Sequence, residues 1–297
     1  INKVEKSLVT DDYNLICSRA TCDELFDFLA KIIGEAIDNN QENHFYLGHT
    51  FSFGSRQTDI NEAYLIKWAK EFAVPGVEGQ NVNALLADAL VRAGFSNVTP
   101  VAVINDTVAV LLAAAYRHPD TRLGSIYATG HNTCYMEMMP AINRPACILN
   151  MESGGFSKLI PTKWDIVLDK ASEQPGRQRL EKMVSGRYMG MLFSNLLVEL
   201  FSLEKVPELS AVDMSAVMEN REKAEQIVQQ LNGQSDDELC DKIRELASAL
   251  AIRSARLVAA TWAGTLWHLA GNGRVQPQHI AVDGSVYQHM PHVKENI

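Results

Sequence analysis

Short polar clusters follow several of the apolar segments in this sequence, where catalytic side chains are often placed. An Asn-Asp-Thr triplet at 105–107 follows the apolar run 101–104, and a Thr-Gly pair at 129–130 separates two further apolar runs. A carboxylate such as Asp106 can act as a general base, and a glycine turn lets backbone N–H groups approach a phosphate. Each cluster alone is more simply explained as a helix cap or a hairpin turn.

The elements that would position these clusters alternate along the chain. Thr21 and Glu24 have the spacing of a capping box, so a helix is predicted over residues 23–38. Strands are expected over 45–53, 101–104, 123–128, 133–138, 147–150 and 279–282, and helices over 82–93, 108–116, 175–201 and 235–270. Residues 60–72 are expected to form a short irregular segment and a helix. This alternation predicts a layered α/β protein.

Composition narrows the function classes. The 297 residues carry a formal charge of −9, with no basic face that would suggest nucleic acid. No apolar run is long enough to predict a membrane span. Five scattered cysteines form no CxxC or zinc-ligand pattern and are expected to be reduced thiols of a cytoplasmic protein. The chain does not begin with Met, so a targeting segment before Ile1 is left open.

The order of the motifs is more informative than any one of them. The motifs, in order, are Gly48-His49-Thr50-Phe51-Ser52-Phe53, Trp68-Ala69-Lys70-Glu71-Phe72, Asn105-Asp106-Thr107, Ala128-Thr129-Gly130-His131-Asn132-Thr133, Asn150-Met151-Glu152, Pro175-Gly176-Arg177-Gln178 with Glu181, and Val282-Asp283-Gly284-Ser285. This succession resembles the eukaryotic-type hexokinase family, including glucokinases, within the actin-like ATPase superfamily, from about Thr21 to Lys294.

The resemblance implies a two-lobed actin-like (ribonuclease H-like) α/β fold with a sugar cleft between the lobes. The smaller lobe would be residues 1–104 and the larger lobe 105–297. Residues around the sugar would be Ser52, Lys70, Asn105, Asp106, Asn132, Glu152, Gln178 and Glu181. Thr129 and Gly130 would form a phosphate hairpin, and Asp283, Gly284 and Ser285 would contact adenosine.

The implied activity is transfer of the terminal phosphoryl group of ATP, with Mg²⁺, to the 6-hydroxyl of a hexose, most simply glucose. Asp106 would act as the general base, and Lys70 would hold the attacking oxygen or a phosphate oxygen. No side chain is assigned as a metal ligand, because Mg²⁺ would bridge the ATP phosphates and keep most of its waters. The oligomeric state is not predicted.

Departures from the family pattern leave alternatives open. Ala69 replaces a usual Thr, and the family's first phosphate motif and closing glycine-rich segment, expected before Ile1 and after Ile297, are missing. An incomplete chain is the simplest explanation, because the sugar residues are all present. A non-catalytic hexose sensor and an actin-like scaffold are the other hypotheses, and the retained Asp106 argues against both.

Overall fold

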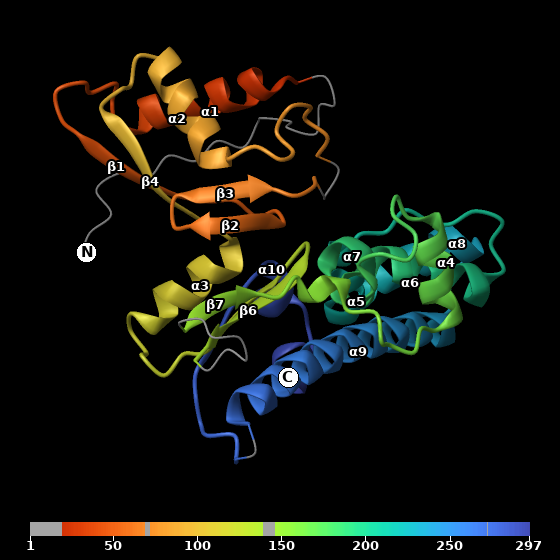
Figure 1. Cartoon of the computed structure of the whole chain (residues 1–297). Coiled ribbons are helices and arrows are strands. Elements are labelled where there is room, and N and C mark those ends of the chain that lie inside the picture. Colours follow the sequence, from red (N-terminus) through yellow and green to blue (C-terminus); the bar gives the residue numbers. More distant parts are fainter. Residues whose placement is uncertain (1–19, 69–71, 139–145, 272) are drawn as a thin grey trace. The chain divides into compact units, whose positions relative to one another are not determined.

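The computed structural model describes residues 20–68, 72–138, 146–271 and 273–297. It falls into two units, Ile1–Ala109 and Val110–Ile297, each with its own hydrophobic core (Figure 1). The division lies within helix α3 (Asp106–Ala115), and the lobe boundary predicted at 104/105 stands just before this helix. Each unit is described below by itself.

Two helices cover the strands of the first unit. Helix α1 (Cys22–Ala36) begins with the predicted capping box, in which the Glu24 backbone N–H donates to Thr21 Oγ1 at 3.2 Å and Thr21 N–H donates to Glu24 Oε2 at 2.7 Å. Helix α2 (Val82–Arg92) packs against α1. Leu25 and Phe26 of α1 join Leu86 of α2 in the core of this unit.

Two neighbouring parallel strands of this unit end together. Strand β1 (Phe45–Thr50) pairs with β4 (Val98–Ile104), and Thr50 lies opposite Ile104. The segment beyond β1 stays in register, because Phe51 N–H donates to Ile104 O at 2.8 Å. Residues that follow both strands therefore lie at one edge of the sheet, the place where α/β proteins usually bind ligands.

The helix expected within residues 60–72 is wrong for the described part of that segment. Strands β2 (Ser55–Asp59) and β3 (Glu62–Leu65) form an antiparallel hairpin instead. Backbone contacts with β4 hold it, since Val103 N–H donates to Ile60 O at 2.9 Å and Gln57 Nε2 donates to Val103 O at 2.8 Å. These contacts are distant in sequence and override the local pattern.

The second unit is built on a four-stranded sheet in the order β7-β6-β5-β8. Strands β5 (Leu123–Tyr127), β6 (His131–Glu137) and β7 (Cys147–Asn150) are antiparallel neighbours, whereas β8 (Ile280–Asp283) runs parallel to β5. The strands lie close to the predicted ranges. The turn from β5 to β6 and the end of β8 therefore lie next to each other.

Helices make up the rest of this unit. They are α4 (Lys163–Ala171), α5 (Arg179–Val184), α6 (Gly186–Phe201), α7 (Ala211–Glu219), α8 (Arg221–Asn232), α9 (Asp237–Ala270) and α10 (Ser285–His289), with short 3₁₀ turns at Ser153–Gly155 and Lys294–Asn296. The single helical stretch predicted over 175–201 is divided, because Ser185 adopts an extended conformation between α5 and α6.

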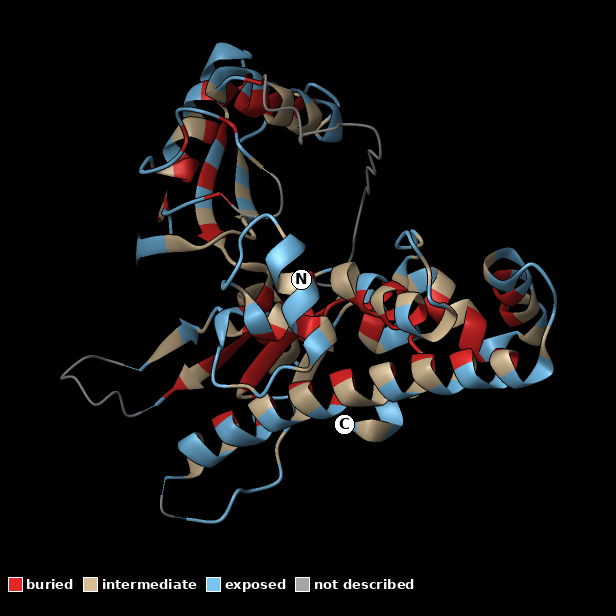
Figure 2. Cartoon of the chain, turned by 90° about the vertical axis from the view of Figure 1, so that its right-hand side faces the viewer, coloured by how far each residue is buried: buried red, intermediate tan, exposed pale blue. Residues whose placement is uncertain are grey.

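The 34-residue helix α9 packs against the helices and the sheet of this unit. Its buried residues lie along one face, and its opposite face is exposed (Figure 2). Buried hydrogen bonds fix it, because the Ser254 hydroxyl bonds to Tyr127 and donates to Val184 O, and Trp262 Nε1 donates to Ser125 Oγ at 3.2 Å. No helix in the described part of the chain combines the length and hydrophobicity needed to cross a membrane.

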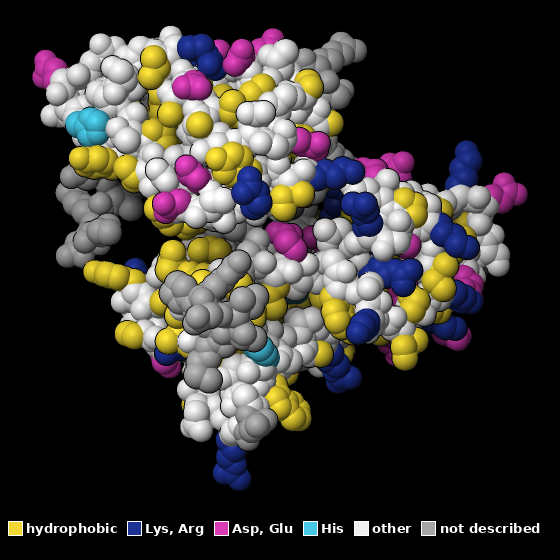
Figure 3. Space-filling model, viewed as in Figure 1, with side chains coloured by type: hydrophobic (Ala, Val, Ile, Leu, Met, Phe, Trp, Pro, Cys, Tyr) yellow, Lys and Arg dark blue, Asp and Glu magenta, His cyan; other side chains and the backbone are white. Residues whose placement is uncertain are grey.

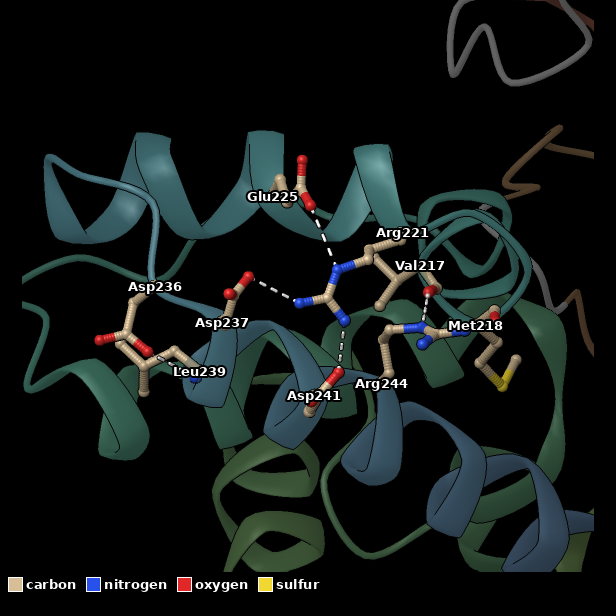
Figure 4. Close-up of polar contacts among 9 residues, drawn as sticks. All are labelled: Val217, Met218, Arg221, Glu225, Asp236, Asp237, Leu239, Asp241 and Arg244. Atoms are coloured by element: carbon tan, nitrogen blue, oxygen red, sulfur yellow. Dashed lines mark hydrogen bonds and ion pairs between the residues drawn. The ribbon is translucent and has the colours of Figure 1, made fainter.

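One arginine ties α8 to the start of α9 (Figure 4). The Arg221 guanidinium contacts Glu225 at 3.2 Å, Asp237 at 2.7 Å and Asp241 at 2.8 Å. Arg244 of α9 donates to Val217 O and Met218 O at the end of α7. The pairs are partly exposed, so their main effect is to fix the geometry of the three helices.

Candidate active site

The sugar residues predicted in the first unit follow the two parallel strands. Ser52 lies just beyond β1, and Asn105 directly follows β4. Both are half-buried. The register of β1 and β4 explains why these residues, 53 positions apart in sequence, come to the same sheet edge.

Asp106 is held at the first position of α3. Asn105 Oδ1 accepts hydrogen bonds from Thr107 N–H at 3.0 Å and from Thr107 Oγ1 at 2.6 Å, as a helix cap does. Asp106 Oδ1 accepts from the same N–H at 2.8 Å. In the part of the chain that the structure describes, Asp106 Oδ2 has no recorded bond. The half-buried carboxylate thus keeps one oxygen available as a proton acceptor.

Lys70 lies outside the described residues, so the structure does not place it. The neighbouring Trp68 is buried, and its Nε1 donates to Val74 O at 2.8 Å. Phe53 lies edge-on to this indole at 4.8 Å, and Phe72 stacks on it at 5.6 Å between ring centroids. Residues on both sides of 69–71 therefore belong to an aromatic cluster close to Ser52 in sequence.

In the second unit, an amide–carboxylate chain connects two predicted sugar residues. Asn132 Nδ2 donates to Asn150 Oδ1 at 2.7 Å, and Asn150 Nδ2 donates to Glu152 Oε1 at 2.9 Å. Asn132 Oδ1 also accepts from Ser153 N–H at 3.2 Å. Glu152 has a left-handed conformation, with φ of 49°, which turns the chain directly after β7.

The other two predicted sugar residues of this unit lie against the same turn. Glu181 Oε2 accepts from His131 N–H at 3.0 Å. Gly154 is closely surrounded, since a Cβ added there would lie 3.0 Å from Gln178 Oε1, 3.0 Å from Glu181 Cβ and 2.9 Å from His131 O. The structure thus brings Asn132, Glu152, Gln178 and Glu181 together at the turn formed by residues 152–154, where a side chain at position 154 would crowd the His131 carbonyl oxygen.

A buried ion pair fixes the loop that ends in Gln178. Lys182 is 4% exposed, and its Nζ lies 2.5 Å from Asp169 Oδ1 and donates to Gln174 O at 2.8 Å. Asp169 also accepts from Gly176 N–H at 2.8 Å. Burial opposes ionisation of this carboxyl, but the bonds from Lys182 and Gly176 outweigh it and lower the Asp169 pKa.

The Thr129-Gly130 turn is docked on the start of α6. Gly186 N–H donates to Ala128 O at 2.8 Å, and Arg187 N–H donates to Thr129 O at 3.1 Å. N–H groups that a helix start leaves without partners therefore hold the turn between β5 and β6. The turn predicted to hold a phosphate group is thus fixed in position by α6.

The Asp283-Gly284-Ser285 segment lies beside that turn. Asp283 pairs in register with Ile126 of β5, and Gly284 has φ of 134°. A Cβ on Gly284 would lie 2.3 Å from Tyr127 O, so no other residue fits without a backbone shift. The structure therefore places the two segments predicted for the nucleotide at the ends of adjacent parallel strands.

Within residues 20–68, 72–138, 146–271 and 273–297, no three His, Cys, Asp or Glu side chains gather as a metal site would require. Glycine turns with exposed backbone suit the phosphates of ATP, which would themselves carry the Mg²⁺.

Sequence reasoning missed His131, Asn150, Gly154 and the Asp169–Lys182 pair as parts of this site. Asn150 stands two residues before Glu152, so its place at the end of β7 was a usable signal. The His131–Glu181 bond spans 50 residues and had no local signal.

Solved structures define the class. The chain matches "Hexokinase from Schistosoma mansoni complexed with glucose" with a TM-score of 0.81 and 29% identity, over 93% of this chain and 68% of that one. A second crystal structure of a hexokinase matches with a TM-score of 0.79 and 29% identity, over 97% of this chain and 69% of that one. The fold is therefore that of the actin-like ATPases, as predicted.

Within that class, the chain belongs to the hexokinase family. A family model described as hexokinase matches residues 122–297, and a second one matches 3–116. Rat (Rattus norvegicus) hexokinase-2 is 35% identical over 94% of this chain, and human (Homo sapiens) hexokinase-1 is 34% identical over 90%. The chain spans about a third of the length of these relatives, 34% and 32% respectively.

Proposed function

We propose that this protein is an ATP-dependent hexose kinase that phosphorylates the 6-hydroxyl of glucose. One observation carries the proposal: Asn132, Glu152, Gln178 and Glu181 gather at the turn formed by residues 152–154, although they come from three separate elements. The similar Schistosoma mansoni hexokinase is described as complexed with glucose, which supports glucose as the substrate.

The chemistry of the converging groups suits an uncharged sugar. Carboxylates and amides form paired hydrogen bonds with neighbouring hydroxyls, and those to charged partners are the stronger ones. Once a bound sugar covers such groups, they reject an analogue that lacks one hydroxyl, because a partner is then left unpaired. The Asn132–Asn150–Glu152 chain and the His131–Glu181 bond hold the acceptors in place before the sugar arrives.

In the proposed reaction, Asp106 accepts the proton of the 6-hydroxyl as its oxygen attacks the terminal phosphorus of ATP. The bond between the terminal phosphorus and the oxygen that bridges it to the β-phosphate breaks, and ADP leaves with that oxygen. The Thr129-Gly130 turn, supported by α6, and the Gly284 segment would hold the nucleotide. The proposal includes ATP as the phosphoryl donor, Mg²⁺ as its metal ion and the cytoplasm as the location of the protein, all three suggested by membership of the family.

The test uses the protein expressed from its complete reading frame, mixed with ATP, Mg²⁺ and glucose and followed by ³¹P NMR. We expect ADP and glucose 6-phosphate in equal amounts. With 6-deoxyglucose, which lacks the attacking hydroxyl, we expect binding without ADP release.

A hexose sensor that binds sugar without turnover is the alternative. Saturable glucose binding with no ADP formed would contradict the kinase and favour the sensor. The available Oδ2 of Asp106 supports the kinase, because a sensor has no use for a proton acceptor at that position.

A further inference from the structure

A pocket of ≈ 160 Å³ lies in the second unit, between residues 159–161 and helices α4 and α5. None of the residues proposed to contact sugar or nucleotide lines it. Its apolar wall comes from Leu159, Pro161, Ile166 and Met183. A cavity of about 150 Å³ lined by apolar side chains accepts benzene, so there is room here for one six-membered ring.

The two acidic residues that line the pocket are already paired. Asp165 is 6% exposed, and Arg253 donates to its two carboxylate oxygens at 2.9 and 3.0 Å. Asp169 is bonded to Lys182, as described above. Neither carboxylate therefore presents an uncompensated negative charge to the pocket.

Two further cations line the pocket, and one of them, Arg179, adds to the positive field that lowers the Asp169 pKa. Lys170 lies in the last turn of α4 and Arg179 begins α5, and both are exposed. Among the described residues, neither side chain makes a recorded hydrogen bond or ion pair. On the face shown in Figure 3, Lys and Arg side chains lie over the α4–α6 region with hydrophobic side chains among them. A positive rim thus borders an apolar wall, although the protein as a whole carries −9.

We propose that this pocket binds a small carboxylate whose apolar body is about the size of one aromatic ring. The ring would pack on Ile166 and Met183, and the carboxylate would lie at the rim, where Arg179 can bond both of its oxygens. The single negative charge of a carboxylate offsets one of the two positive charges at the rim. A doubly charged phosphate has no apolar body to fill the wall and suits the pocket less well.

Occupancy would also act on the sugar residues, a step that rests on the proposed function. Lys182 lines the pocket and bonds to Gln174 O and Asp169, which hold the loop ending in Gln178. A carboxylate competes with Asp169 for the Lys182 ammonium group. The loop then loses part of its support, so glucose should bind more weakly when the pocket is filled.

Calorimetric titration of the full chain with benzoate tests the site. We expect saturable binding, and weaker binding by about tenfold or more for Arg179→Gln, the loss of one charge-assisted interaction. Benzamide has the same shape without the charge, so it should bind to the wild type as weakly as benzoate binds to Arg179→Gln. Ile166→Glu, which places a negative charge on the exposed edge of the wall, should abolish benzoate binding. Lys158→Gln is the matched control, because it removes an exposed charge that does not line the pocket.

Absence of benzoate binding to the wild type, or equal losses in Arg179→Gln and Lys158→Gln, would overturn the site. The coupling is tested separately by titrating glucose with and without saturating benzoate. An unchanged glucose affinity would overturn the coupling and leave the site standing. If glucose does not bind at all, the proposed function fails while the benzoate result still stands.

Discussion

At the scale of single residues, the site depends on polar side chains that the fold buries beside the sugar residues. His131 is 2% exposed, and its Nδ1 lies 3.1 Å from Ile126 O. A carbonyl oxygen only accepts, so Nδ1 carries the proton and Nε2 is the acceptor. Burial lowers the pKa of His131 to about 4. The imidazole is therefore neutral while its backbone N–H holds Glu181.

This pKa predicts how stability depends on pH. In the unfolded chain the imidazole gains a proton below about pH 6.5, but in the folded chain only near pH 4. The free energy of unfolding should therefore fall as the pH drops from 6.5 to 4, by up to about 3 kcal/mol. His131→Gln should remove most of this slope in urea unfolding curves measured at pH 7 and pH 5. His268→Gln is the exposed control, and an equal slope in wild type and His131→Gln would contradict the assignment.

At the scale of elements, the contacts of a segment decided how well the sequence predicted it. Helix α1 was predicted because its capping box is local. Strand β3 was missed, and an irregular segment and a helix were expected over 60–72 instead, because contacts with β4 hold the β2–β3 hairpin. The break at Ser185 was missed because it also depends on a contact that is distant in sequence: the first N–H groups of α6 donate hydrogen bonds to the β5–β6 turn. The resemblance supplied the candidate residues Asn132, Glu152 and Glu181, but it did not indicate that Asn150 connects two of them.

The junction of β8 and α10 gives a prediction about an element. Gly284→Ala forces a Cβ to 2.3 Å from Tyr127 O at a φ that alanine rarely adopts. We expect a loss of about 1–3 kcal/mol in unfolding free energy, together with weaker ATP binding. Gly264→Ala is the control, because Gly264 lies within α9 and a Cβ there meets nothing within 4 Å, and it should stabilise by about 0.5–1 kcal/mol. Unchanged stability and ATP affinity in Gly284→Ala would contradict the close approach of Gly284 to the Tyr127 carbonyl oxygen.

At the scale of the whole molecule, the proposed sugar contacts belong to both units. Ser52 and Asp106 lie in the first unit, and Asn132 and Glu181 lie in the second. A hexose that bonds to both groups must bind best to the arrangement that brings them together. Sugar alone should therefore shift the population toward that arrangement, without nucleotide.

Scattering and fluorescence test this shift. The radius of gyration should decrease at saturating glucose, and tryptophan emission should change saturably. Trp68, which packs in the aromatic cluster beside residues 69–71, should carry most of the signal, so Trp68→Phe should abolish most of it. Trp267 is 72% exposed, and Trp267→Phe serves as the control. Compaction only after nucleotide is added would contradict closure by the sugar.

The central claim is that Asp106 is the general base of a hexose kinase, and one variant tests it most directly. Asp106→Asn keeps the shape of the side chain and its bond from Thr107 N–H, but removes the proton acceptor. Glucose dissociation constant and turnover number are measured together, with Asp88→Asn on the exposed face of α2 as the control. We expect glucose affinity within about tenfold of the wild type and turnover lower by at least about 10²-fold. Turnover equal to the wild type in Asp106→Asn would contradict the account.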